Sequence, residues 1–109
     1  MTSMNVELLV VPDCPHEQPA ASLLRSALDD VGLAAVEFDV TVIATQEEAE
    51  QRAFAGSPTI LLNGNDPFQT PRQPASVACR IYPGGGGLPD LRALRRELKR
   101  AAAVDRAPR

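Results

Sequence analysis

The sequence predicts a single α/β domain in which a four-stranded mixed sheet carries helices on both faces. The 109 residues are enough for one hydrophobic core and one domain, which we expect to span residues 1–104, with 105–109 as a frayed tail. Apolar residues make up 44% of the chain and charged residues 23%, as in ordinary globular proteins. The hydrophobic pattern alternates between strand and helix periods in the order βαβαββα.

The first strand and the first helix flank a short polar segment. Val6 to Val11 is an almost continuous apolar run, typical of a strand that is buried on both faces. After residues 12–16, apolar residues recur at three- and four-residue spacing as far as Val31, and Gly32 follows. This spacing predicts an amphipathic helix that ends at the glycine.

A second strand, a second helix and a third strand follow. Residues 36–42 alternate between apolar and polar side chains, which predicts a strand. Thr45 and Glu48 have the spacing of a capping box and predict a helix that begins at Thr45 and ends near Gly56. Residues 57–62 predict a third strand that starts with a proline.

The last part of the chain predicts a loop, a strand and a helix. Residues 63–75 contain an Asn-Gly turn and several prolines, so we expect an irregular loop there. Residues 77–82 form the fourth predicted strand, 83–87 a flexible corner, and Pro89 opens the final helix. The first two strands should be parallel because a helix connects them, and the last two antiparallel because a loop joins them.

Charge and hydropathy restrict the partners and the location. The net charge of −3 argues against nucleic acid as a partner. No segment approaches the ~20 apolar residues that span a bilayer, and no signal peptide is recognisable, so we expect a cytoplasmic protein with no membrane partner and no cofactor. Basic residues crowd the C-terminal end, where we expect a solvated helix face: Arg92, Arg95, Arg96, Lys99, Arg100, Arg106 and Arg109.

Cys14 is the residue with the clearest chemical potential. It lies between a buried strand and a helix, where it faces unpaired N–H groups and the positive end of the helix dipole. Both features favour the thiolate, which makes Cys14 a candidate nucleophile or soft-metal ligand. His16 could add a positive charge or a hydrogen-bond donor.

Three segments resemble the thioredoxin-like superfamily. Residues 10–16 are similar to its active-site strand and loop, and Cys14-Pro15-His16 matches the opening of the Cys-Pro-His-Cys motif of its disulfide oxidoreductases. Residues 57–60, Ser-Pro-Thr-Ile, resemble the segment that holds its cis-proline. Residues 87–89 resemble the start of its final helix.

The resemblance implies a thioredoxin-like fold and a set of site residues. Pro58 would be cis and would lie beside Cys14, and the Ser57 backbone would pair with an extended substrate or partner peptide. The implied catalytic residues are Cys14, His16 and Pro58. The implied substrate-binding residues are Pro15, Ser57 and Thr59.

One departure from the superfamily changes the expected chemistry. Glu17 stands where the superfamily has its second, resolving cysteine, so the dithiol reaction cannot run through this pair of positions. A one-cysteine site could still form a mixed disulfide with a protein disulfide or a low-molecular-weight thiol, as monothiol glutaredoxins do with glutathione. Cys79 is the candidate second thiol. In the predicted topology its Cα would lie ~9–10 Å from that of Cys14, beyond the ~7 Å limit for a disulfide.

A second resemblance is to small bacterial thioredoxin-like proteins labelled as related to alkylmercury lyase. The segments that carry it are residues 12–16, 56–59, 66–68, 79–82 and 87–89. It implies a mercury or soft-metal site formed by Cys14 and Cys79, with Asp13 or Asp66 as the acid.

Three hypotheses therefore remain for the function. The first is a thiol redox protein that uses Cys14, and the second is a redox-inactive binding module in which Cys14 is inert. The third is the two-cysteine mercury or soft-metal site. We also expect Cys79 to be buried, with Arg80 and Tyr82 on the opposite, exposed face of their strand.

Overall fold

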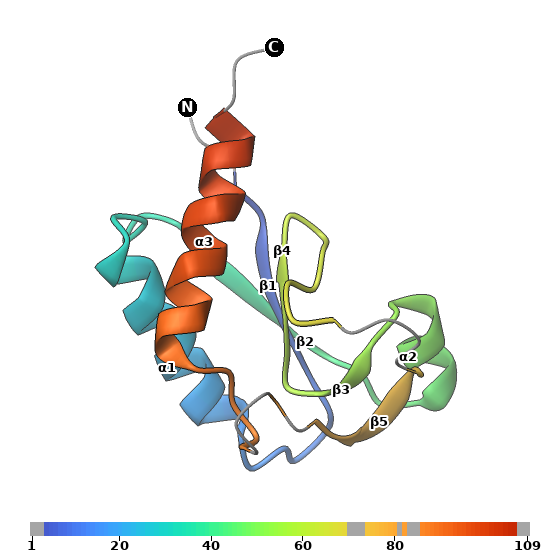
Figure 1. Ribbon diagram of the computed structural model, residues 1–109. Coiled ribbons are helices and arrows are strands. Elements are labelled where there is room, and N and C mark those ends of the chain that lie inside the picture. Colours follow the sequence, from blue (N-terminus) through green and yellow to red (C-terminus); the bar gives the residue numbers. More distant parts are fainter. Residues whose placement is uncertain (1–3, 70–73, 81, 83–85, 107–109) are drawn as a thin grey trace.

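A computed structural model of the chain describes residues 4–69, 74–80, 82 and 86–106, with the backbone alone for Cys79 and for residues 104–106. Figure 1 shows two long helices beside a small sheet, with a second group of short elements at one end. In chain order the elements are β1 (Val6–Val10), α1 (Glu17–Asp30), β2 (Phe38–Val42), α2 (Gln46–Gln51), β3 (Ala55–Ser57), β4 (Thr59–Leu62), β5 (Ser76–Cys79) and α3 (Leu91–Arg106).

The strands form two sheets, so the prediction of a four-stranded mixed sheet, and of the thioredoxin-like fold that it was part of, is wrong. One sheet has three strands in the order β2-β1-β4, and the other has two in the order β3-β5. The predicted parallel pairing of β1 with β2 is confirmed, and β4 pairs with β1 in the antiparallel direction. The last strand, β5, runs parallel to β3, which contradicts the predicted antiparallel pair.

Pro58 explains why the predicted third strand divides between the two sheets. Proline has no backbone N–H and cannot continue a ladder of hydrogen bonds. Ser57, which precedes it, ends β3, and Thr59, which follows it, begins β4. The peptide bond between Ser57 and Pro58 is cis, as expected. The chain therefore changes sheets at this proline, and β5 finds its partner in β3.

The helices bury apolar side chains against both faces of the three-stranded sheet. Figure 1 shows α1 and α3 side by side, and the two helices are in contact. Together with one face of the sheet they form the larger core, whose members include Val6, Leu8, Val10, Leu24, Leu28, Ile60, Leu94 and Leu98. On the other face α2 contributes to a smaller core, which contains Leu9, Ile43, Ala49, Phe54 and Leu61.

Side-chain hydrogen bonds cap the N-termini of α2 and α3. The predicted capping box is confirmed, because Thr45 Oγ1 accepts a hydrogen bond from the Glu48 amide and the Glu48 carboxylate accepts one from the Thr45 amide. In α3 the Asp90 carboxylate accepts a hydrogen bond from the Ala93 amide and caps the first turn. The predicted end of the domain at residue 104 falls inside α3. Residues 70–73 of the predicted loop, 83–85 of the predicted corner and 107–109 of the predicted tail lie outside the described residues.

One further property of the fold concerns the membrane. In the part of the chain that the structure describes, no helix combines the length and the hydrophobicity needed to cross a bilayer.

Gly56 provides a test of the pairing between β3 and β5. It has a φ of +127°, and a Cβ added there would lie 3.0 Å from the Cβ of Arg80 and 3.2 Å from the carbonyl oxygen of Ala78. We predict that Gly56→Ala lowers the free energy of unfolding by about 2–5 kcal/mol, from backbone strain and from overpacking. The matched control is Gly64→Ala, where φ is +83° but the space is open, and where about 1–2 kcal/mol is expected. Urea denaturation measures both, and equal losses would contradict the close approach of β5 to β3.

Candidate functional site

Cys14 lies in the loop between β1 and α1, at the edge of the larger core. Its carbonyl oxygen accepts a hydrogen bond from the amide of Glu17, the first residue of α1. The thiol is free, and only 8% of the residue is exposed. Cys14 thus lies between a strand and a helix, as predicted, but it precedes the N-cap residue of α1, and the residue is largely enclosed.

The Ser57 hydroxyl contacts the sulfur directly. Its Oγ donates a hydrogen bond to Cys14 Sγ across 3.0 Å. The same Oγ accepts a hydrogen bond of 3.1 Å from the amide of Val11, the residue after β1. The amide uses one acceptor position of the oxygen, and the one proton of the hydroxyl serves the bond to the sulfur. The side chain of Ser57 thus connects the end of β1 with the loop that carries Cys14.

The Ser57 backbone has a different role from the one that the resemblance implied. Ser57 has no exposed surface, and its carbonyl oxygen accepts a hydrogen bond of 2.9 Å from the amide of Arg80. That carbonyl is therefore already used inside the protein and is not open to an extended peptide. A role was expected for the Ser57 backbone, and the contact of its hydroxyl with Cys14 was not predicted. The signal was a serine directly before the proline that we expected beside Cys14.

His16 occupies the N-cap position of α1, and its side chain makes no capping hydrogen bond. The imidazole lies against Gly87, because a Cβ added to Gly87 would be only 2.6 Å from Cε1 of the ring. The Nδ1 atom is buried and has no hydrogen-bond partner within the described part of the chain. No hydrogen bond joins His16 to Cys14 in these residues, so the predicted pair is close in sequence without a direct polar contact.

The other predicted site residues lie in contrasting environments. Pro15 is exposed, whereas Pro58 and Thr59 are buried. The Pro58 carbonyl accepts a hydrogen bond from the Tyr82 hydroxyl. Thr59 Oγ1 donates to the Gly56 carbonyl and accepts from Arg80. Of the three residues predicted to bind substrate, Pro15 is exposed to solvent, whereas Ser57 and Thr59 are covered by other parts of the protein.

A buried ion pair lies behind this site and corrects the prediction that Arg80 and Tyr82 are exposed. The Arg80 guanidinium is 2.6 Å from the Asp66 carboxylate, and the two side chains are 2% and 5% exposed. Arg80 also donates to the Phe68 carbonyl and lies 4.5 Å above the centre of the Tyr82 ring. Arg80 can be buried because its charge is paired and its donors have acceptors. Through this ion pair and its hydrogen bond to Thr59, Arg80 joins three of the segments that carry the second resemblance, namely 56–59, 66–68 and 79–82.

Cys79 and Asp13 add little to the site that can be described. The backbone of Cys79 pairs in register with Ser57, and its side chain lies outside the described residues. Asp13 is exposed and has a φ of +57°. Among the residues whose side chains are described, no group of three or more His, Cys, Asp or Glu could hold a metal ion.

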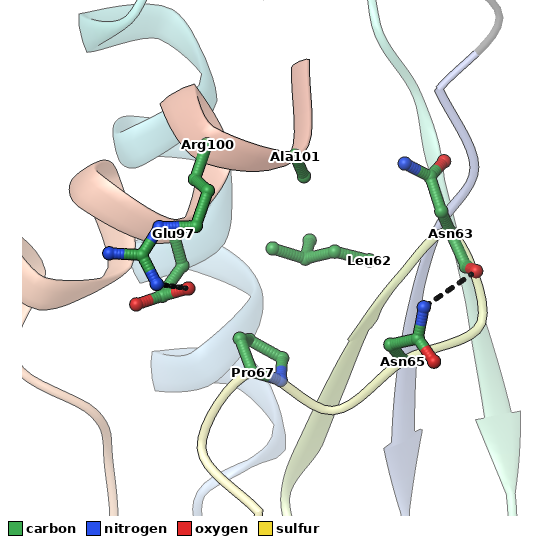
Figure 2. Close-up of a pocket in the computed structure, with 7 residues that line it drawn as sticks. All are labelled: Leu62, Asn63, Asn65, Pro67, Glu97, Arg100 and Ala101. Carbon is green, nitrogen blue, oxygen red and sulfur yellow. Dashed lines mark hydrogen bonds and ion pairs between the residues drawn. The ribbon is translucent and has the colours of Figure 1, made fainter. Parts of the chain in front are cut away.

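Two surface hollows lie away from Cys14. One has a volume of about 270 Å³ and lies between the turn after β4 and α3. Figure 2 shows its lining, with Asn63 and Asn65 on one side, Glu97 and Arg100 on the other, and Leu62, Pro67 and Ala101 completing it. The other has a volume of about 410 Å³ along the basic face of α3 and is lined by Arg92, Arg95, Arg96 and Lys99. Neither contains a thiol, so neither is part of the site at Cys14.

Comparison with protein-family models, with curated proteins and with solved structures finds no match for this chain.

Tyr82 gives a prediction about alkaline pH. Its burial raises its pKa well above the ordinary value of about 10, an effect that Arg80 opposes and Asp66 reinforces. The folded protein therefore holds the phenol proton more tightly than the unfolded chain, and this stabilisation is complete below pH ~10 and declines as the pH rises further. Because Tyr82 is the only tyrosine, we predict no tyrosinate absorbance at about pH 11 in the folded protein and clear absorbance in urea. Equal titration in both states would show that the phenol is solvated.

Proposed function

We propose that this protein is a thiol redox protein that uses Cys14 alone, either to exchange with a disulfide or to carry a glutathionyl group. The observation that carries the proposal is the hydrogen bond from the Ser57 hydroxyl to Cys14 Sγ. A hydroxyl that donates to sulfur stabilises negative charge on it, and hydrogen bonds to charged groups are stronger than those between neutral groups. Cys14 also lies just before the N-terminus of α1, whose positive dipole end favours negative charge nearby.

The proposed reaction has two balanced steps. In the first step the Cys14 thiolate attacks one sulfur of a disulfide, so a mixed disulfide forms, the original S–S bond breaks and the other sulfur leaves as a thiolate. In the second step a low-molecular-weight thiol, as its thiolate, attacks the mixed disulfide and releases Cys14. Glu17 has no sulfur and cannot resolve the mixed disulfide, and the proposal assigns the resolving step to a thiol from solution rather than to Cys79. We place this reaction in the cytoplasm, where such thiols are kept reduced.

Access is the feature that separates this proposal from its main alternative. Cys14 is 8% exposed, and buried structural cysteines are usually inert. This burial favours the alternative of a redox-inactive binding module, in which the hydrogen bond from Ser57 holds the loop in place. The two functions differ in one property: whether Cys14 reacts in the folded protein or only after the chain unfolds.

We predict that glutathione disulfide modifies Cys14 in the folded Cys79→Ser protein at pH 7, and that Ser57→Ala in the same background slows the modification about tenfold. The expected factor corresponds to the loss of one hydrogen bond to a charged sulfur. Intact-mass spectrometry against time measures the rate. The matched control is Ser76→Ala, because the Ser76 hydroxyl accepts a local hydrogen bond from Ala78 and lies on a different strand.

Two outcomes would contradict the redox proposal. If Cys14 reacts only at the rate of global unfolding, measured by hydrogen exchange, the binding module is correct. If Ser57→Ala and Ser76→Ala react at the same rate as the parent, the hydroxyl has no influence on the sulfur. Circular dichroism checks that each variant is folded, since Ser57→Ala also leaves the Val11 amide without its acceptor and should cost about 1–3 kcal/mol of stability.

The mercury hypothesis depends on the side chain of Cys79 and has its own test. A two-thiolate site predicts that the parent protein retains Hg²⁺ in the presence of a competing thiol and that Cys79→Ser loses it. Retention by Cys79→Ser would rule out the two-cysteine site. Equilibrium dialysis with metal analysis measures the retention.

A further inference from the structure

The outer edge of β2 is an open sheet edge. β2 lies at the end of the order β2-β1-β4 and pairs on one side with β1. Among the residues that the structure describes, none pairs with its other side. Natural proteins commonly protect such edges with lysine or proline, and β2 contains neither, with Asp39 as its one charged residue.

The direction of the backbone groups along β2 follows from one hydrogen bond. The amide of Ile43, directly after β2, donates to the carbonyl oxygen of Val10 in β1. Because backbone groups alternate in direction along a strand, Thr41 and Asp39 also face β1. The amides and carbonyls of Phe38, Val40 and Val42 therefore point outward, towards the open edge.

Exposed apolar side chains lie on the edge strand β2. Val40 and Val42 are 44% and 50% exposed, and within the described residues the only other large exposed apolar side chain is Val77 at 37%. In the register with β1, Val40 lies opposite Leu8 and Val42 opposite Val10, so both valines belong to the face that carries the larger core. The larger core reaches β2 at Phe38, which packs against it, and the same face of β2 is open at Val40 and Val42.

We propose that β2 pairs with β2 of a second copy of this chain, antiparallel and centred on Val40, so that one sheet runs through both copies. In this register Val40 lies opposite Val40, and Phe38 lies opposite Val42. The outward backbone groups of these residues form hydrogen-bonded pairs. Asp39 lies opposite Thr41, so no two like charges face each other directly. The strand is thus complementary to itself in hydrogen bonding, in hydrophobicity and in charge.

The expected dimer is weak and depends on salt. A single pair of five-residue strands buries less than the roughly 1,200 Å² of a standard stable interface. Each copy also carries a net charge of −3, and salt screens the repulsion between the two. Dimerisation should therefore increase with protein concentration and with ionic strength.

Sedimentation equilibrium of the full chain tests the proposal. Two variants place a positive or a negative charge at position 40, the centre of the proposed strand pair. Val40→Lys and Val40→Glu should each weaken self-association at least about tenfold, because like charges then face each other. An equimolar mixture of the two variants should recover dimers, because lysine of one copy then faces glutamate of the other. Val77→Lys is the matched control and should associate as the unmodified chain does.

Three results would contradict the proposed pairing of β2 with β2. A chain that stays monomeric at the highest soluble concentration and high salt overturns the proposal. Equal weakening by Val77→Lys would show non-specific apolar association. Failure of the mixture to recover dimers, with both variants folded by circular dichroism, would exclude pairing centred on Val40.

Discussion

The Ser57 side chain is the contact on which the arrangement around Cys14 depends. Its hydroxyl accepts a hydrogen bond from the amide of Val11, the residue after β1, and donates one to the sulfur. Its carbonyl oxygen accepts a hydrogen bond from the amide of Arg80. One buried residue therefore connects the three-stranded sheet, the two-stranded sheet and the loop before α1. A smaller or larger side chain would leave the Val11 amide unpaired or displace the loop, so position 57 influences both the fold and the environment of the thiol.

The buried ion pair of Arg80 and Asp66 is connected to Ser57 through the backbone of Arg80. Burial of these charges is favourable only with complete pairing, which here includes the Phe68 carbonyl and Thr59. Since the Arg80 amide binds Ser57, the position of this ion pair and the position of the hydroxyl beside the sulfur are linked through two adjacent strands. The two-stranded sheet thus has a clear structural role: it holds Ser57 against the end of β1.

Sequence patterns predicted the features that depend on residues close together in the chain. The apolar run of β1 and the capping box at Thr45 both depend on residues within a few positions of each other. The cis peptide bond before Pro58 was implied by the resemblance, and the change of sheets at this proline was not predicted. The pairing of β5 with β3 and the burial of Arg80 beside Asp66 join residues far apart in the chain, and a lone arginine in a strand pattern usually indicates an exposed face. The contact of Ser57 with Cys14 joins residues 43 positions apart, and no periodicity reports such a contact.

The Ser57 hydroxyl donates its proton to a hydrogen bond with the sulfur of Cys14. Proton NMR tests this most directly, because a hydroxyl held between an amide and a sulfur exchanges slowly with water. We expect a resolved Ser57 hydroxyl resonance with a nuclear Overhauser effect to the Cys14 β protons, and loss of that resonance in Cys14→Ala. Rapid exchange of the hydroxyl in the folded protein, with no such effect, would show that the hydroxyl does not bind the sulfur.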